Sequence, residues 1–238
     1  LGVMILFVKL LLAHLIGDFI LQPRAWVTAK ETWKLKAWQL YAHVLIHAVL
    51  VTVIVWDVYF WPWGLLIAGT HFVIDALKIT LQNERTKRVL FFVDQALHIG
   101  VLFVVACAYQ DYVPELIILG DPRILLFITC IVFLTSPASA SIRFFIARWT
   151  PHLPEGDDES LQSAGKYIGI LERLFVFAFF ASGHPEGVGF LIAAKSVFRF
   201  GDLKEAKSRK LTEYVLIGTL ISFGIAMLTG IVFARLIS

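Results

Sequence analysis

Eight long apolar stretches dominate the chain, and most charged residues lie in the segments between them. The stretches cover residues 3–21, 42–58, 61–81, 89–109, 124–148, 166–183, 186–200 and 213–237. A helix of roughly 20 apolar residues crosses the roughly 30 Å hydrocarbon core of a membrane. The pattern therefore predicts an all-α protein, a polytopic transmembrane helical bundle of about eight helices. The seventh stretch is short and contains Lys195 and Arg199, so it is either a tilted span or a re-entrant segment, and seven spans are the alternative.

The segment between the first two stretches has a pattern of its own. Trp26, Trp33 and Trp38 stand among lysines, which predicts a short helix in the cytoplasmic headgroup layer. Inside the fifth stretch, Pro137 predicts a kink, because proline lacks the N–H that a helix needs. Between the fifth and sixth stretches, an acidic run that ends at Glu159 predicts a solvated loop.

Basic residues gather in alternate connecting segments. Fourteen Lys and Arg residues lie in segments 22–41, 82–88, 148–166 and 199–212, whereas the other connections contain only Arg123. Cytoplasmic loops of membrane proteins carry such an excess of positive charge. We therefore expect both termini to be non-cytoplasmic. We also expect one transmembrane domain over residues 1–238, with a metal-binding four-helix half (1–110) and a C-terminal helical half (111–238).

Composition agrees with this class. Of the 238 residues, 58% are hydrophobic and 16% are charged, whereas soluble domains have about 45–50% apolar and about 25% charged residues. The net charge of +3 gives no indication of nucleic-acid binding. Cys107 and Cys130 lie within apolar stretches, which favours packing roles over a disulfide.

Each of the first four stretches carries a pair of His or Asp residues four positions apart. The pairs are His14 and Asp18, His43 and His47, His71 and Asp75, and Asp94 and His98. Residues at this spacing share one face of a helix, so all four pairs can face a common axis. Five imidazoles and three carboxylates form a ligand set for one or two divalent metal ions, with Zn²⁺ favoured and Fe or Mn as alternatives. Bound metal would also neutralise three buried carboxylates.

A metal-free hydrogen-bonded network or proton relay is the alternative interpretation. A single His or Asp in a membrane helix usually hydrogen-bonds to a neighbouring helix. The coincidence of four pairs favours metal binding. Asp18 and His43 lie nearest the ends of their stretches, so we expect them to orient other ligands.

A second group of charges lies in the C-terminal stretches. Glu172 is in the sixth stretch, Lys195 and Arg199 are in the seventh, and Glu213 begins the eighth. Ion pairs among them would hold three helices in register. Alternatively, these residues line a substrate site in which Lys195 and Arg199 bind an anionic group such as phosphate.

Two longer motifs carry a resemblance to a known family. The first is AHLIGDFILQ (Ala13–Gln22), and the second is GFLIAAKS (Gly189–Ser196), which continues through Arg199 and Phe200 to Glu213–Thr219. Together they resemble an uncharacterised bacterial family of integral membrane proteins, known as a domain of unknown function. The resemblance implies a multi-pass protein of the bacterial inner membrane and implies no activity. The His-x-x-x-Asp pairs also resemble ligand pairs of helical zinc-dependent phospholipases C and of intramembrane ceramidases.

These features together favour a membrane-embedded, metal-dependent hydrolase with a binuclear centre. Its substrate would be a lipid or phosphoester in the cytoplasmic leaflet, and Asp75 or Asp94 would be the general base. The alternatives are a divalent-metal or proton transporter or sensor, and a structural protein that metal holds together. A transporter needs polar groups on both sides of its site, whereas the outer half of this bundle is almost wholly apolar. No oligomeric state follows from the pattern.

Overall fold

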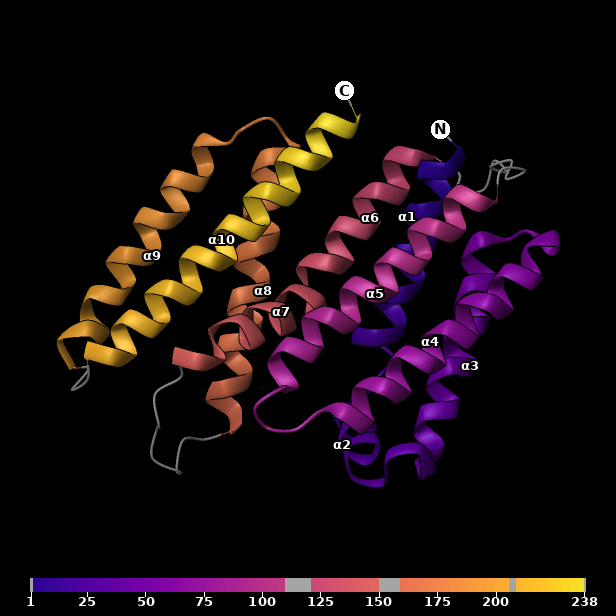
Figure 1. The fold of residues 1–238 in the computed structure, drawn as a ribbon. Coiled ribbons are helices and arrows are strands. Elements are labelled where there is room, and N and C mark those ends of the chain that lie inside the picture. Colours follow the sequence, from indigo (N-terminus) through magenta and orange to yellow (C-terminus); the bar gives the residue numbers. More distant parts are fainter. Residues whose placement is uncertain (1, 110–120, 150–158, 206–208, 238) are drawn as a thin grey trace. The chain divides into compact units, whose positions relative to one another are not determined.

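The computed structural model describes residues 2–109, 121–149, 159–205 and 209–237, and in these ranges every regular element is a helix (Figure 1). This confirms the predicted all-α class. The helices are α1 (Gly2–Phe19), α2 (Arg24–Trp33), α3 (Trp38–Val55), α4 (Trp61–Leu81), α5 (Lys87–Ala108), α6 (Pro122–Leu134), α7 (Ser136–Ile146), α8 (Glu159–Ala181), α9 (Glu186–Glu205) and α10 (Arg209–Ile237). Short 3-10 turns cover Lys34–Lys36, Val58–Phe60 and Ala147–Trp149.

Five helices in the described ranges are long and apolar enough to cross a membrane. They are α1, α3, α4 with the turn before it, α5 and α10. The pair α6 and α7 would be a sixth span if it counts as one, with a bend of 40° at its break. The sixth and seventh predicted spans form α8 and α9, but neither helix is among the five. The set is compatible with a multi-pass membrane protein.

The acidic run before α8 falls mostly outside the described residues. Glu155, Asp157 and Asp158 lie there, whereas Glu159 is the first residue of α8. The loop predicted for Glu159 is therefore wrong at that position, because the helix extends several residues ahead of the apolar stretch that begins at residue 166.

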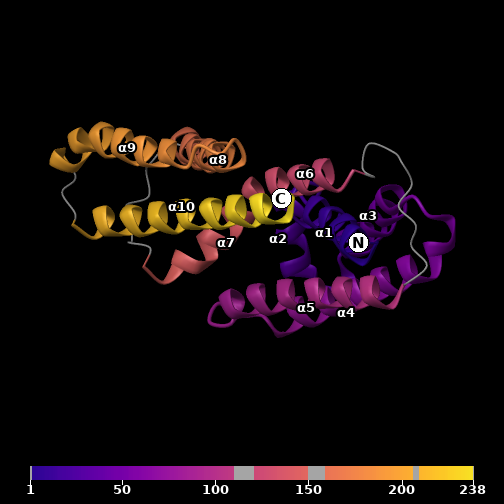
Figure 2. The same ribbon diagram turned by 90° about the horizontal axis from the view of Figure 1, so that it is seen from above.

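Contacts divide the chain into two compact units, Leu1–Val132 and Phe133–Ser238. In the first unit, α1 packs against α3 and α5, and α4 packs against α3 and α5, so that four helices form a closed ring. Consecutive helices of the ring run in opposite directions (Figure 1), and Figure 2 shows the ring from above. The short helix α2 lies at the end of the ring where α1 ends and α3 begins (Figure 1).

Local signals explain how the ring helices begin and end. Trp56 adopts the left-handed conformation (φ 54°) after α3, and its N–H donates to the carbonyl of Thr52. Pro62 stands in the first turn of α4, where no helical N–H is needed. Between α4 and α5, the side chain of Asn83 accepts hydrogen bonds from two backbone N–H groups of the turn.

The apolar core of the first unit lies in the half of the ring away from α2. Its residues are fully or almost fully buried and come from all four ring helices, the turn before α4 and the first turns of α6. They include Ile5, Leu6, Leu10, Leu12, Ala13, Val51, Ile54, Val55, Phe60, Ile67, Leu102, Val105, Ala106 and Leu125. Lys9 is buried beside this core and donates to the carbonyl of Val55, the last residue of α3, at 3.2 Å.

In the second unit, the buried Arg173 of α8 stabilises the break between α6 and α7. Its guanidinium donates to the carbonyls of Leu134 (2.7 Å) and Thr135 (3.1 Å), which lie at the break. It also donates to the hydroxyls of Ser139 and Ser222. The kink predicted from Pro137 is present as this break. No pattern within α8 predicts these partners of Arg173, because Leu134 lies 39 positions away in the sequence.

Candidate metal centre

Three layers of side chains fill the α2 end of the ring. Each ring helix contributes three residues, spaced four apart, which therefore lie on one helix face. They are Leu10, His14 and Asp18 in α1; Val51, His47 and His43 in α3; Ile67, His71 and Asp75 in α4; and Leu102, His98 and Asp94 in α5. The first layer is apolar, the second has four imidazoles, and the third has three carboxylates and His43. All are buried except Asp18, whose side chain is 10% exposed.

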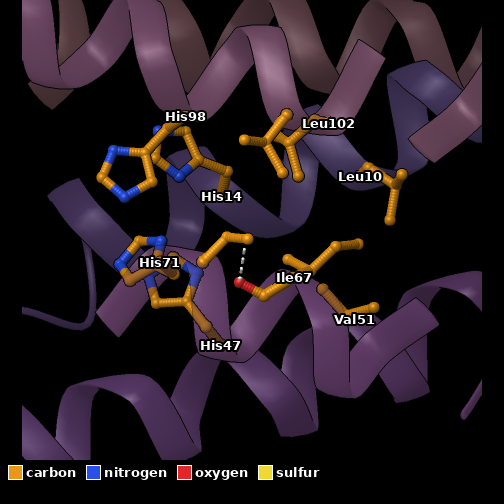
Figure 3. A pocket seen from close by; sticks show the side chains of 10 residues that line it. Leu10, His14, His47, Val51, Ile67, His71, His98 and Leu102 are labelled. Carbon is orange, nitrogen blue, oxygen red and sulfur yellow. Dashed lines mark hydrogen bonds between the residues drawn. The ribbon is translucent and has the colours of Figure 1, made fainter. Parts of the chain in front are cut away.

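A small cavity of about 10 Å³ separates the apolar layer from the imidazole layer. Figure 3 shows its two walls, with the rings of His14, His47, His71 and His98 on one side and four aliphatic side chains on the other. A cavity of this size has room for about one water molecule or ion. The imidazole layer is therefore accessible to a small ligand inside the ring.

All eight His and Asp residues that the sequence predicted as metal ligands meet in this cluster. Their ligand atoms lie within 4.8 Å of one another in three overlapping groups: His14, Asp18, His47 and His71; His43, His71 and Asp75; and Asp18, Asp94 and His98. Ligand atoms around a tetrahedral Zn²⁺ ion are about 3.3 Å apart, as follows from bonds of about 2.0–2.1 Å. Small side-chain movements would therefore convert such a group into a coordination shell.

Asp18 is at the centre of the cluster. Its Oδ1 atom lies 2.9 Å from Nε2 of His47 and 3.2 Å from Nε2 of His43. The Nε2 atom of His71 lies 3.6 Å from the same oxygen. The expectation that Asp18 only orients other ligands rests on its position near the end of its stretch. The structure corrects the premise, because α2 covers that end of the ring and Asp18 does not lie at an open surface.

The side chain of Gln95 joins the carboxylates to the imidazoles. Its amide nitrogen donates to Asp18 Oδ2 at 3.0 Å and to Asp94 Oδ2 at 3.1 Å. Its amide oxygen lies 3.3 Å from His14 Nε2, so this nitrogen is the donor. Gln95 is not among the residues predicted from the sequence, because an uncharged amide is ordinary in a helix. Only its position directly after Asp94 in the sequence suggests that Gln95 lies near the predicted ligands.

Two lysines neutralise two of the three carboxylates. Lys30 of α2 lies 2.8 Å from Asp75 Oδ2, and Lys78 of α4 lies 2.7 Å from Asp94 Oδ2. Lys30 is buried against the ring, with only 5% of its surface exposed. With neutral imidazoles the cluster keeps one negative charge. Metal is therefore not needed to neutralise three carboxylates, which corrects that part of the sequence argument.

Further contacts attach α2 to the ring. Lys34, directly after α2, donates to the carbonyl of Ile79 in α4. Glu31 of α2 forms an ion pair with Lys87 of α5 at 2.8 Å. Together with the bond from Lys30, these contacts hold α2 across the carboxylate layer.

Three buried side-chain atoms of the cluster lack a hydrogen-bond partner among the described residues. They are His43 Nδ1, Asp94 Oδ1 and His98 Nε2. The Nδ1 atom of His98 faces the carbonyl of Asp94 at 2.9 Å and must donate to it, so Nε2 carries a free lone pair. A backbone carbonyl commonly holds a metal-binding histidine in this tautomer. Since buried polar atoms almost always have partners, their clustering here indicates a ligand site.

Gly17 allows the close approach of α1 and His47. A Cβ atom at position 17 would lie 2.5 Å from Cε1 and Nε2 of the His47 ring. The absence of a side chain therefore permits His47 to reach Asp18, the next residue of α1. This gives a steric reason for the glycine in the His-Leu-Ile-Gly-Asp segment.

The predicted C-terminal charges lie in the second unit. Lys195 of α9 lies 2.6 Å from Glu172 Oε2 of α8, so the predicted ion pairing is present for these two residues. Glu213 is exposed in the first turns of α10. The side chain of Arg199 lies outside the described residues.

Comparison with known proteins identifies a family. No curated protein and no solved structure matches the chain. A family model described as "protein of unknown function (DUF3307)" matches residues 6–127. The match includes the Ala13–Gln22 motif and all eight His and Asp residues of the cluster, whereas the motif that begins at Gly189 lies beyond it. Because the match covers just over half of the residues, the chain belongs to the DUF3307 family, whose function is unknown.

Proposed function

We propose that this protein is a multi-pass membrane protein that binds a divalent metal ion, Zn²⁺ being favoured, and uses it to hydrolyse a lipid or a phosphoester. The observation that carries the proposal is the cavity lined by four imidazoles, one of which, His98, has a buried Nε2 atom without a hydrogen-bond partner among the described residues. Imidazole and carboxylate ligands suit Zn²⁺, and no cysteine belongs to the cluster.

The outer surface of the ring supports insertion in a membrane. On α3, the residues Leu45, Val49 and Val53 are each at least half exposed, whereas His43 and His47 are buried on the opposite face. Exposed aliphatic side chains around a polar interior suit a hydrocarbon environment. With the basic connecting segments on the cytoplasmic side, α2 and the carboxylate layer would face the cytoplasm and both termini the other side. We place the protein in the bacterial inner membrane.

His14, His47 and His71, with Asp18, would hold the ion, and His98 lines the same cavity. A bound divalent ion supplies Lewis acidity and makes water a better nucleophile. Oδ1 of Asp94 is buried and has no hydrogen-bond partner in the part of the chain that the structure describes, while Lys78 and Gln95 donate to its Oδ2, so Oδ1 is placed to accept a proton. Asp75 is the second candidate base, although the ammonium of Lys30 lies on its Oδ2.

The apolar layer closes the site on the side away from α2. Leu10, Val51, Ile67 and Leu102 close the ring beyond the imidazoles, and the apolar core continues from there. A transporter would need a polar path on that side as well. We therefore propose that substrate reaches the site from the α2 end. Binding of a substrate phosphate by Lys195 and Arg199 stays a prediction, and Lys195 already pairs with Glu172.

Elemental analysis of the full chain in mild detergent tests this proposal. Wild type is expected to retain zinc, manganese or iron, and His14→Ala is expected to lose it. His184→Ala is the matched control, because His184 is an exposed histidine of the second unit. Metal-loaded protein is then assayed on lipid and phosphoester substrates.

Folded wild type without metal after zinc loading would overturn the proposal. The lysines on Asp75 and Asp94 would then indicate a self-contained hydrogen-bonded network, and proton transport would be the function to assay. Metal binding without hydrolysis of any substrate would instead favour the structural or sensor alternative.

A further inference from the structure

A second cation position exists in the cluster beside the one proposed for the metal ion. It is formed by His43, His71 and Asp75, whose ligand atoms lie within 4.8 Å of one another. Oδ2 of Asp75 lies 3.7 Å from His43 Nε2. His43 is 1% exposed, and its Nδ1 atom has no partner among the described residues. Two imidazoles and a carboxylate are a common protein ligand set for Zn²⁺.

The ammonium of Lys30 already lies at this position. Its Nζ atom is 2.8 Å from Asp75 Oδ2, the same oxygen that faces His43. The residue is 5% exposed, so the ammonium has little water to replace its carboxylate partner. An ammonium and a divalent ion repel each other strongly at such short range inside a protein. The amine therefore excludes metal from the carboxylate that this second position requires.

The attachments of α2 keep Lys30 there. Lys34 donates to the carbonyl of Ile79 in α4, and Glu31 forms an ion pair with Lys87 in α5. Lys30 cannot leave Asp75 by a large movement of α2 without breaking these contacts. The Lys30 ammonium is therefore the cation that pairs with Asp75 in the folded protein.

The three ligand groups do not offer equal alternatives for a second ion. His71 belongs to both the first and the second group. If it binds an ion at the second position, the first group still has three ligands, His14, Asp18 and His47. The third group shares Asp18 with the first and would fall to Asp94 and His98 without it. The position at Asp75 is therefore the one that a second ion would take.

We propose that the cluster holds a single divalent ion because the Lys30 ammonium occupies the second cation position at Asp75. This inference rests on the proposed metal binding and replaces the expectation of a binuclear centre with a site for one ion. Removal of the amine converts the cluster into a two-ion site.

Metal stoichiometry of the full chain tests the inference. Protein in detergent is loaded with Zn²⁺, desalted and analysed for zinc per chain. Wild type is expected to retain about one equivalent and Lys30→Met about two, since Asp75, His43 and His71 then form a free ligand set. The matched control is Lys36→Met, which removes an exposed lysine six positions after Lys30. It is expected to stay at about one equivalent.

A double variant separates charge from packing. Lys30→Met with Asp75→Asn removes both members of the ion pair and is expected to return to about one equivalent, because the second position has lost its carboxylate. If Lys30→Met does not fold, Lys30→Gln removes the charge, keeps a donor for Asp75 and is expected to give the same gain.

The outcomes distinguish this inference from the proposed function. About two equivalents in wild type, or about one in every folded Lys30 variant, would overturn the inference and leave metal binding standing. Zinc absent from wild type would overturn the proposed function and the inference with it.

Discussion

Gly17→Ala is the most specific test of how the ring positions its histidines. A new Cβ at this position would lie 2.5 Å from the His47 ring, whereas ordinary contacts begin at 3.4 Å. The ring must therefore withdraw by about 1 Å, which is the scale of misplacement that impairs a site. The hydrogen bond from His47 Nε2 to Asp18 Oδ1, now 2.9 Å, would lengthen beyond hydrogen-bonding range.

Two destabilising effects, overpacking and the loss of a hydrogen bond, determine how much stability Gly17→Ala is expected to lose. Overpacking of a filled core costs about 1–3 kcal/mol, and loss of a buried hydrogen bond to a charged group costs about 1.5–3 kcal/mol. Alanine has a helix propensity about 1 kcal/mol better than glycine, which opposes these terms. We therefore expect Gly17→Ala to lose about 2–4 kcal/mol of stability and about 10–100-fold in metal affinity.

The assay compares Gly17→Ala with Gly69→Ala, both in ring helices. A Cβ at Gly69 meets no described atom within 4 Å, so this control keeps the propensity gain without the clash. Thermal unfolding in detergent measures stability, and competition with a chelating zinc indicator measures affinity. Wild-type affinity and a rise in unfolding temperature for Gly17→Ala, equal to that of the control, would refute the geometric reasoning.

Three further outcomes are expected. Arg173→Met leaves the carbonyls at the α6–α7 break without this donor and should cost about 1–3 kcal/mol in thermal unfolding; a change no larger than that of Arg143→Met, at an exposed arginine, would contradict the assigned role. Gln95→Leu removes the donor to two carboxylates and should weaken zinc binding about 10–100-fold in the indicator assay; unchanged binding would exclude Gln95 as a positioning residue. Chelator treatment should lower the unfolding temperature of wild type and Zn²⁺ should restore it, because a ligand of the folded state stabilises that state; the His14→Ala variant should show no such response.

The sequence by itself determined the helices and the inner faces of four of them. An i, i+4 pair such as His14 and Asp18 specifies a face within one helix, because that spacing is a property of the helix and needs no partner. Four such pairs in successive apolar stretches were enough to predict that the eight residues would gather in one cluster, and the structure brings their ligand atoms together in three overlapping groups. The break at Pro137 was equally local, since proline acts on its own helix.

The tertiary structure decided everything that depends on contacts between distant segments. Lys30 lies on Asp75 across 45 positions, and Arg173 reaches Leu134 across 39. No periodicity within one helix encodes such pairs. The position of Asp18 near the end of its own helix predicted that it lies near a surface. In the structure α2 covers that end of the ring, and Asp18 lies at the centre of the His and Asp cluster. The charge balance of the cluster, and with it the number of ions it can hold, follows from these contacts, because a buried charge is compensated by whichever group packs against it.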